Sequence, residues 1–490
     1  MKIHELHKNA KVPDDHVAIK FKDRIYSYGE VDSLIDKYAS FFQSIGVKKG
    51  DRVALSFPNC PEYIFSFMGA SKAGAIVVPL NMMLTLEEIA YIIMESGANT
   101  LVVHPVIAQK VDKSQLGRLN LKNVVVLDEN TINAILKMGP SQHVEIEPDE
   151  VCTYIYTSGT TGKPKGAMLT HNNFIADVKA LDDVSDLGPE DNFLCVLPLF
   201  HSFSWTVNIL LGFYLGSAIT IKESFMPKDT LETLTKEDVT VFCGVPSMFA
   251  VLMRMAEKGQ FKALRLAISG GAPLAPEIQR GFEEKFNFPL VEGYGLSEAA
   301  PVALLNPLEP DAIRKPGSVG LPLPCVEAKI VDENDNELPV GEVGELVLRG
   351  PNIMVGYHNM PEETAQTLRG GWLHTGDLAK KDEDGYFYIV DRLKDMIILG
   401  GFNVYPREVE DALLEHPDVL EAAVIGVGDT LKGEEVKAFV VLKEGAKADK
   451  KDLQNFLKYK LASYKIPKIF EFVPELPKNA AGKIQKKLLK

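Results

Sequence analysis

The chain has 490 residues, more than one hydrophobic core usually supports, so two or more domains are expected. Its content of 46% hydrophobic and 24% charged residues is that of an ordinary globular protein and excludes a disordered chain. The net charge of −14 argues against broad binding of nucleic acids or of anionic membranes.

The first third of the chain alternates amphipathic helices with short apolar strands. Apolar residues at helical spacing between Val31 and Ile45 predict a helix that ends at Gly46, and Thr85 with Glu88 predicts a capping box on a later helix. The short apolar segments that predict strands are 52–57, 76–80, 100–103, 124–127 and 151–156. Strands that alternate with helices predict a mostly parallel, doubly wound sheet.

The strand at 151–156 is followed by a loop of glycines, hydroxyl side chains and lysines. In order, this loop contains Tyr156, Thr157, Ser158, Gly159, Thr160, Thr161, Gly162, Lys163, Pro164, Lys165 and Gly166. Glycines bring backbone N–H groups close to a ligand, and the two lysines supply positive charge, so the loop is predicted to bind a polyphosphate. Its spacing differs from the Gly-x4-Gly-Lys-Ser/Thr loop of the common nucleoside triphosphatases. A flexible surface linker is the alternative, although two lysines around a proline are not typical of linkers.

The alternation resumes later and then changes character. Strands are predicted at 240–245, 264–268 and 289–291. The last two are followed by Gly-rich turns, which are expected to form one wall of a pocket. From Val326, short strands at 327–331, 345–349 and 386–391 predict a β-rich subdomain. A smaller α+β unit follows, with helices at 406–415 and 452–461 and strands at 422–427 and 436–442. The domain boundary is placed near Arg392 to Lys394.

Four polar residues gain chemical meaning only in combination. Asp377 on a Thr-Gly-Asp turn is suited to accept hydrogen bonds from a ribose diol, and Glu298 is suited to hold Mg²⁺. His201 lies in an apolar segment and Lys483 in a lysine-rich tail. Taken alone, each has an ordinary interpretation: a turn, a surface glutamate, a core histidine or a solvated lysine.

In combination, these segments resemble the adenylate-forming enzymes, which include acyl-CoA synthetases, aryl-CoA ligases, firefly luciferase and the adenylation domains of peptide synthetases. The resemblance covers the whole chain and rests on the glycine–lysine loop followed, in order, by Gly293 to Glu298, Thr375 to Asp377, Asp391 to Asp395 and Gly482–Lys483. The chain looks most similar to bacterial fatty acyl-CoA synthetases, especially at 291–302 and 391–410.

The resemblance implies a fold and a role for each matching residue. It implies a large domain, 1–392, that binds ATP and the acid, and a small mobile lid, 393–490, with its hinge at Lys394. Lys483, Glu298 and His201 are the implied catalytic residues, Glu298 being also the Mg²⁺ ligand. The implied ATP- and AMP-binding residues are Thr157, Ser158, Gly159, Thr160, Thr161, Gly162, Lys163, Lys165, Gly271, Ala272, Pro273, Tyr294, Gly295, Ser297, Asp377 and Arg392. Gly400, Gly401 and Phe402 are implied to serve the half-reaction with CoA.

The implied activity is that of an ATP- and Mg²⁺-dependent ligase that activates a carboxylic acid as an acyl adenylate and transfers it to CoA. The segment 197–205 is apolar and has no acidic residue to bind a substrate amine, which favours a medium- or long-chain fatty acid. An aryl acid, a carrier protein as the acyl acceptor and a non-catalytic binder are the alternatives. We expect a cytoplasmic location, with no nucleic-acid partner and no transmembrane segment, and the sequence leaves a homodimer open.

Overall fold

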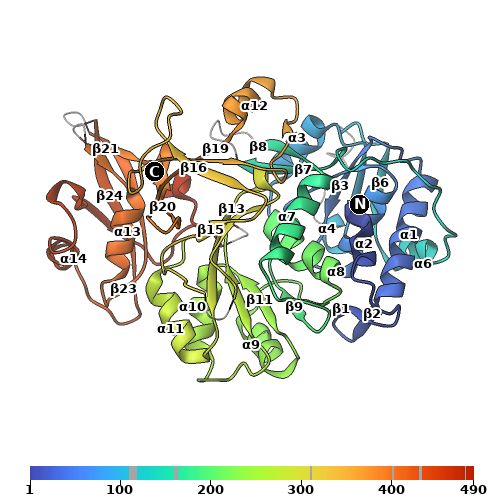
Figure 1. The fold of residues 1–490 in the computed structure, drawn as a ribbon, viewed down its shortest axis with the longest axis horizontal. Helices are drawn as coiled ribbons and strands as arrows, with labels where there is room; N and C mark the ends of the chain where they lie inside the picture. The colour runs from blue at the N-terminus through green and yellow to red at the C-terminus, as the bar shows by residue number, and fades with distance from the viewer. Residues whose placement is uncertain are drawn as a thin grey trace. The chain divides into compact units, whose positions relative to one another are not determined.

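The computed structural model describes residues 1–109, 119–158, 164–309, 312–399, 402–429, 433–479 and 482–489, and it contains two compact units (Figure 1). Unit 1 consists of Met1–Glu327 and Leu348–Leu373, and unit 2 consists of Ala328–Val347 and His374–Lys490. The chain therefore passes between the units after Glu327, after Val347 and after Leu373. This division reflects compactness, whereas the boundary expected near Lys394 concerns a hinge of motion and stays a prediction.

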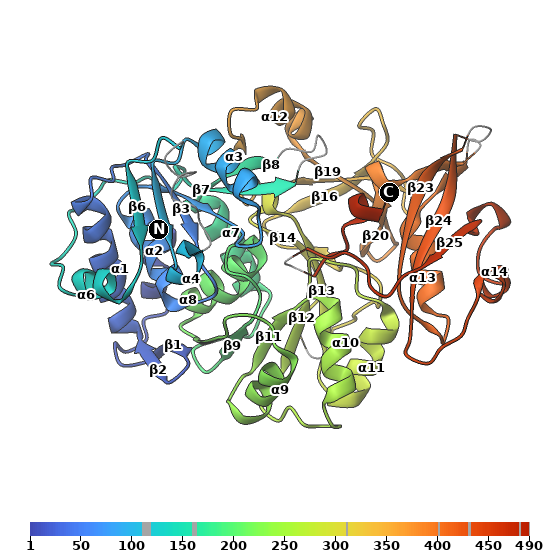
Figure 2. The same cartoon turned by 180° about the vertical axis from the view of Figure 1, so that it is seen from behind.

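Unit 1 contains a nine-stranded sheet that is largely parallel in its centre. Its strand order is β15-β14-β13-β12-β11-β9-β10-β1-β2. The strands are β1 (Val17–Phe21), β2 (Arg24–Ser27), β9 (Asn192–Cys195), β10 (Ala218–Ile221), β11 (Val241–Gly244), β12 (Leu266–Ser269), β13 (Leu290–Gly295), β14 (Val302–Leu305) and β15 (Leu321–Pro322). Figures 1 and 2 both show α9 (Pro227–Lys236), α10 (Pro246–Met255) and α11 (Pro276–Phe286) beside β11 to β13. Phe242, Phe249 and Phe282 are fully buried between these helices and the sheet.

Unit 1 also contains a seven-stranded sheet, which carries the glycine–lysine loop. Its strand order is β18-β8-β7-β4-β3-β5-β6. The strands are β3 (Arg52–Ser56), β4 (Ile76–Pro79), β5 (Thr100–Val103), β6 (Asn123–Val126), β7 (Val151–Ser158), β8 (Pro164–Thr170) and β18 (Gly356–Tyr357). The parallel pairing of β3 with β4 and β5 confirms the doubly wound pattern expected from the sequence.

The helices of unit 1 begin and end at residues with recognisable capping chemistry. The capping box of Thr85 and Glu88 is confirmed at the start of α3, which ends at Gly97 in the left-handed conformation, and Ser27 with Glu30 caps α1 in the same way. The longer helices besides α9 to α11 are α1 (Tyr28–Ser44), α2 (Pro61–Lys72), α3 (Leu86–Ser96), α6 (Glu129–Leu136) and α7 (His171–Asp183). Shorter helical segments are the 3-10 helix η1 (Ile3–Lys8), α4 (Pro105–Ala108), α8 (Leu211–Leu215) and α12 (Pro361–Thr367).

Two strand ends differ from the sequence-based expectation. The strand expected at 151–156 continues to Ser158, and Pro164–Thr170 returns antiparallel to it, so the loop joins the two strands of a hairpin. The strand expected at 289–291 continues to Gly295, so Gly293-Tyr294-Gly295 is part of β13 and pairs with β14. Both glycine-containing segments looked like turns because glycine is uncommon inside strands.

The long apolar segment after β9 contains a π-helix. Residues Ser204–Leu210 form this element, η2, which continues directly into α8, and all seven of its residues are buried. Trp205 stacks on Phe67 of α2 with ring centroids 4.0 Å apart. π-Helical turns are rare and often lie near functional sites, and this one follows His201 directly.

Unit 2 combines two sheets. The four-stranded sheet has the order β16-β17-β19-β20, with β16 (Glu327–Val331), β17 (Gly344–Arg349), β19 (Leu373–Lys381) and β20 (Phe387–Arg392). The second sheet contains β21 (Ile397–Leu399), β22 (Phe402–Val404), β23 (Val419–Asp429), β24 (Gly433–Leu442) and β25 (Ile469–Phe472). The helices are α13 (Pro406–Leu414) and α14 (Lys450–Leu457), the latter beginning earlier and ending earlier than expected.

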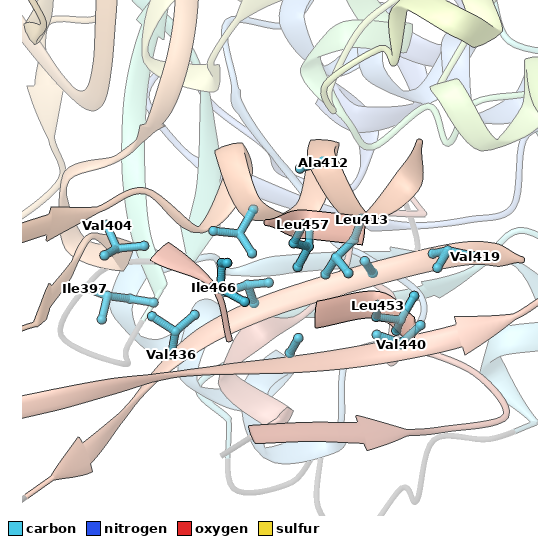
Figure 3. Close-up of a cluster of buried hydrophobic side chains, with 14 of the residues drawn as sticks. Ile397, Val404, Ala412, Leu413, Val419, Val436, Val440, Leu453, Leu457 and Ile466 are labelled. Atoms are coloured by element: carbon cyan, nitrogen blue, oxygen red, sulfur yellow. The ribbon is translucent and has the colours of Figure 1, made fainter. Parts of the chain in front are cut away.

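Both faces of the β23–β24 hairpin are buried. One face packs with α13 and α14 in the cluster shown in Figure 3, which includes Val436, Val440 and Leu413. The other face, which includes Phe439, packs with Leu476 and Leu489, so the C-terminal segment is anchored in the core of unit 2. This anchoring fixes the segment that carries Lys483.

Among the described helices, none is both long and apolar enough to cross a lipid bilayer. The mixed α/β class, the large N-terminal part built on sheets and the smaller C-terminal α+β part agree with the expected fold.

Candidate active site

The side chains of two strands converge on Glu298 in unit 1. Glu298 lies in the short 3-10 turn η3 (Ser297–Ala299), and its Oε1 accepts hydrogen bonds from Thr157 Oγ1 at 3.2 Å and Tyr357 Oη at 2.9 Å. Its backbone carbonyl accepts a third bond from the N–H of Met354 at 2.8 Å. Among the described residues, none donates to Oε2. The carboxylate is therefore held at one oxygen and keeps the other for a ligand.

Tyr357 is a member of this cluster that sequence reasoning missed. It lies on β18, which reaches the site by pairing antiparallel with β8. Burial, and next the negative charge of Glu298, raise the pKa of the Tyr357 hydroxyl, which keeps it a hydrogen-bond donor. Nothing local in the sequence marks Tyr357, because its role depends on pairing between segments far apart in the chain.

The described ends of the glycine–lysine loop lie at this same cluster. Thr157 is near the end of β7, and Lys165, on β8, is 9% exposed with its Nζ 5.4 Å from the centroid of the Tyr357 ring. This distance is typical of a cation–π contact. The predicted phosphate-binding residues Gly159, Thr160, Thr161, Gly162 and Lys163 lie outside the described residues, and of Ser158 only the backbone, paired with Pro164, is described.

The turn after β13 joins Glu298 to the segment of His201. Ser297 Oγ lies 3.2 Å from Ser202 Oγ, and the backbone N–H of Phe203 donates to His201 Nδ1 at 3.2 Å. Gly295 makes this turn possible, since a Cβ there would lie 2.1 Å from the carbonyl oxygen of Pro301. The structure thus brings together Ser297, Glu298 and the segment that begins at His201.

A buried carboxylate on β13 links the Gly-rich segment after β12 to the Gly-rich end of β13. The N–H of Leu274, which follows Gly271, Ala272 and Pro273, donates to Glu292 Oε1 at 2.9 Å. β12 and β13 are parallel neighbours, as expected from the sequence. Tyr294 and Gly295 lie further along β13, so the predicted adenine-binding residues share one edge of the sheet.

The apolar residues that follow His201 do not all face the same surroundings. A Cβ on Gly270 would lie 3.2 Å from the ring of Phe203, so Phe203 lies against the Gly-rich segment after β12. Trp205, Val207 and Ile209 are at most 2% exposed. Trp205 is stacked on Phe67, so these three belong to the core, and Phe203 is the better candidate for a wall of the acid-binding site.

In unit 2, Asp377 and Arg392 form an ion pair across a hairpin. They are directly opposite in the β19–β20 register, and Arg392 Nε lies 3.0 Å from Asp377 Oδ1. Asp377 is 4% exposed, while the Arg392 side chain is 42% exposed. A buried carboxylate held by a partly exposed guanidinium is suited to bind vicinal hydroxyl groups.

Lys483 lies in a turn whose ends form an isolated bridge between Lys478 and Ile484. Its backbone N–H donates to Asn479 Oδ1 at 2.9 Å, and Lys486 Nζ contacts Glu410 Oε1 at 2.7 Å. Desolvation by the surrounding protein, followed by repulsion from Arg392, lowers the pKa of Lys483 to about 8, and Asp377 acts in the opposite direction. The side chain keeps an exposed surface, which weakens this effect without changing its direction.

The hinge and CoA-half-reaction residues are described only in part. Lys394 lies in the 3-10 turn η5 (Leu393–Asp395), where desolvation and next Arg392 lower its pKa. Gly400 and Gly401 lie outside the described residues, and of Phe402 only the backbone, paired with Leu399 in β22, is described.

The chemistry of the unit 1 cluster fits Mg²⁺, which prefers oxygen ligands. Glu298 offers a carboxylate oxygen without a protein donor among the described residues, and the hydroxyl oxygen of Thr157 lies next to it. The part of the chain that the structure describes contains no cluster of three or more histidine, cysteine or acidic side chains that would bind a metal ion without a ligand's help. The oxygen atoms of Glu298 and Thr157 are donors of the kind that Mg²⁺ prefers.

Comparisons with known proteins cover nearly the whole chain. The model of the AMP-binding enzyme family matches residues 6–358, and that of the AMP-binding enzyme C-terminal domain matches residues 408–483. A long-chain-fatty-acid–CoA ligase from Bacillus subtilis (strain 168) is 38% identical, with 98% of this chain and 92% of the relative covered. A feruloyl-CoA synthase from Amycolatopsis sp is 36% identical, with 98% and 96% covered.

Two solved structures show the same similarity in three dimensions. The crystal structure of ATP-bound MatB from Rhodopseudomonas palustris is 32% identical with a TM-score of 0.93, and 100% of this chain and 98% of that chain are covered. The anthranilate CoA ligase AuaEII in complex with anthranoyl-AMP is 30% identical with a TM-score of 0.92, and 100% and 96% are covered.

Proposed function

The chain belongs to the AMP-binding enzyme family, the adenylate-forming enzymes, and from that premise we propose that its substrate is a medium- or long-chain fatty acid. It is an ATP-dependent acyl-CoA ligase of the AMP-forming, acid–thiol class and uses ATP, Mg²⁺ and CoA. Several relatives at 35–38% identity are long-chain-fatty-acid–CoA ligases, which supports the proposed substrate. The apolar segment after His201, which has no acidic residue, supports it as well.

The observation that carries the role of unit 1 is the convergence of Thr157 and Tyr357 on Glu298. Thr157 begins the glycine–lysine loop, so the loop and the carboxylate act on the same end of ATP. We assign the β- and γ-phosphates to the loop and Lys165, and Mg²⁺ to Glu298. Bound Mg²⁺ would neutralise charge on the phosphates of ATP.

In the first half-reaction, a carboxylate oxygen of the acid attacks the α-phosphorus of ATP. The bond from that phosphorus to the bridging oxygen breaks, and pyrophosphate leaves with its electron pair. No general base is needed, since the acid is already ionised at neutral pH. Negative charge grows around phosphorus in the transition state, and the ammonium of Lys483 is proposed to stabilise it, while Asp377 and Arg392 hold the ribose.

In the second half-reaction, the thiol sulfur of CoA attacks the acyl carbon of the adenylate, and AMP leaves. Stabilisation of the first transition state by Lys483 is no longer needed at this stage. We propose that the segment 393–490 rotates about Lys394 between the two steps, which removes Lys483 and presents Gly400 to Phe402. Because the two steps need different residues, a variant can lose one step and keep the other.

An aryl acid is the second candidate substrate. One relative is a feruloyl-CoA synthase, and one similar structure is an anthranilate CoA ligase. An aromatic ring of the substrate could pack on the Phe203 ring as favourably as an alkyl chain could. The contacts of Phe203 therefore do not separate the two classes of acid.

The test is ATP- and CoA-dependent release of AMP across a panel of acids matched in solubility. The panel contains straight-chain acids of increasing length, benzoate-type acids and cinnamate-type acids. We expect the highest kcat/KM for a medium- or long-chain acid, with a value rising with each added methylene up to an optimum. Turnover of aryl acids alone would overturn the proposed substrate. Replacing CoA by an acyl carrier protein tests the remaining acceptor, and we expect no transfer to it.

A further inference from the structure

A buried glutamate on β17 holds the beginning of β19, the segment 374–377 that includes Asp377; the turn expected there from the Thr-Gly-Asp motif is part of this strand. Glu345 Oε1 accepts a hydrogen bond from the backbone N–H of Gly376 at 3.0 Å, and Glu345 Oε2 lies 2.8 Å from His374 Nδ1. The side chain of Glu345 is 12% exposed and that of His374 is 5% exposed. Both carboxylate oxygens are thus used on the residues that directly precede Asp377.

The hydroxyl of Thr375 ties the same segment to β17 and also binds the backbone of Asp377. Thr375 Oγ1 donates to the carbonyl oxygen of Leu346 at 2.7 Å and accepts from the N–H of Asp377 at 3.1 Å. Gly376 has a φ of +69°, in the left-handed region. A strand residue in this conformation interrupts the regular ladder, and the N–H groups of Gly376 and Asp377 are bound by the side chains of Glu345 and Thr375.

The backbone conformation of Thr375 and Gly376 determines where the Asp377 carboxylate lies. Asp377 follows Gly376 directly in β19 and lies opposite Arg392 of β20. Asp377 Oδ1 lies 3.0 Å from Arg392 Nε. A charged hydrogen bond to a buried N–H is stronger than a neutral one, so Glu345 restricts this segment more firmly than a neutral side chain would. Loss of Glu345 would leave the N–H of Gly376 without its charged acceptor and would free Asp377 to move.

We propose that Glu345 is a positioning residue for the nucleotide: through Gly376 and His374 it fixes the Asp377 carboxylate at the place where the ribose hydroxyls bind. The proposal rests on the proposed role of Asp377 as the ribose-binding residue. Glu345 itself does not touch the substrate. It therefore affects the KM for ATP and the recognition of the ribose hydroxyls, and it leaves the KM values for the acid and for CoA unchanged.

The experiment compares ATP with 2′,3′-dideoxy-ATP in the wild type and in Glu345→Ala, Glu345→Gln and Asp377→Asn. The readout is the ratio of kcat/KM for the two nucleotides, because a general loss of structure lowers both values and leaves the ratio intact. The control is Asp382→Asn. Asp382 also accepts two backbone N–H bonds, from Asp384 at 3.0 Å and Tyr386 at 2.9 Å, at the far end of the same hairpin.

For Glu345→Ala we expect a KM for ATP raised about tenfold, the size of one charged hydrogen bond, and a ratio reduced towards that of Asp377→Asn. Glu345→Gln keeps a carbonyl oxygen for the Gly376 N–H and should recover most of the ratio, and Asp382→Asn should keep all of it. An unchanged ratio in Glu345→Ala together with a reduced ratio in Asp377→Asn would overturn the positioning role alone. An unchanged ratio in Asp377→Asn would overturn the ribose assignment on which it rests.

Discussion

The charge of Lys483 should determine how the rate of the first half-reaction falls at alkaline pH. Its pKa is lowered to about 8, chiefly by desolvation and next by Arg392, and the protonated form is the one that offsets charge at phosphorus. Adenylation, measured by ATP–pyrophosphate exchange, should therefore be fastest below this pKa and fall as the pH rises through it. Thioester formation from supplied acyl adenylate should not show this fall.

Mutation of Lys483 should affect the two half-reactions differently. Lys483→Ala should reduce pyrophosphate exchange by a factor of 100 or more, roughly the value of one electrostatic contact to a transition state, and should spare thioester formation. Lys478→Ala is the control on the same tail, since Lys478 instead pairs with Glu421 at 2.5 Å. Equal loss of both half-reactions in Lys483→Ala would contradict the assigned role.

Tyr357 should set the requirement for Mg²⁺. Tyr357→Phe removes the hydroxyl that donates to Glu298 at 2.9 Å and keeps the ring beneath Lys165. One hydrogen bond contributes about 1 kcal/mol, so we expect the Mg²⁺ concentration for half-maximal exchange to rise about fivefold. Tyr388→Phe, which removes a hydroxyl bound to Asp382, is the matched control. An unchanged Mg²⁺ titration would show that Tyr357 only packs.

At the residue scale, the charged residues of the site could be predicted from the sequence, but the residues that hold them in place could not. Glu298, Asp377 and Lys483 stand in short segments whose composition itself suggests chemistry. Tyr357 reaches Glu298, and Glu345 reaches the neighbours of Asp377, from strands that are distant in the chain. No local pattern encodes such a contact, so neither residue was predicted.

At the scale of elements, strand interiors were predicted better than strand ends. β7 and β8 form one hairpin, although Pro164 and Lys165 look like loop residues, because Pro164 is the first residue of β8, where a missing N–H is tolerated. Gly293 lies inside β13 because Leu305 on β14 approaches it closely, at 2.9 Å from where a Cβ would be. The π-helix after His201 was missed because a fully buried segment has no polar face to reveal a helical period.

The close approach at Gly295 gives a test of the turn that carries Ser297 and Glu298. In Gly295→Ala, the new Cβ would lie 2.1 Å from the backbone oxygen of Pro301, so the strand end must shift. We expect at least a tenfold loss of pyrophosphate exchange, because Glu298 moves with the turn, and a lower melting temperature. Gly139→Ala is the control, since nothing lies within 4 Å of its Cβ position. Full activity in Gly295→Ala would show that the turn adapts.

At the scale of the whole molecule, two buried histidines link stability to pH. The rings of His4 and His171 meet edge-on at 5.7 Å, and the N–H of Ile3 donates to His171 Nδ1 at 3.3 Å. Desolvation lowers the pKa of His4, and desolvation opposed mainly by Glu150 lowers that of His171 to about 4. Both are therefore neutral at pH 7 in the folded protein.

The direction of the pH effect follows from proton binding. Between the folded pKa of His171 and the unfolded value of about 6.5, the unfolded chain binds more protons, so stability falls as the pH falls through this window. We expect His171 to account for about 2 kcal/mol of the stability lost between pH 7.5 and pH 5. Urea unfolding of His171→Gln should show a correspondingly smaller loss.

The control for this prediction is His16→Gln. His16 is bonded to the carbonyl oxygen of Pro189 at 3.1 Å at an exposed position, so this variant measures what the loss of an exposed histidine does to unfolding. If His171→Gln loses as much stability on acidification as the wild type, buried histidine protonation is not the cause.

The three chain passages between the units have a consequence for how the protein is made and how it can be cut. During synthesis, the ribosome delivers β16 and β17 before residues 350–373, the rest of the last segment of unit 1, and before their sheet partners β19 and β20. The four-stranded sheet therefore has only two of its strands until the last segment of unit 1 has been synthesised. A fragment that begins at residue 393 lacks this sheet entirely, and a fragment that begins at His374 lacks β16 and β17. Any attempt to express unit 2 alone must join 328–347 to 374–490 with a short linker in place of the intervening segment.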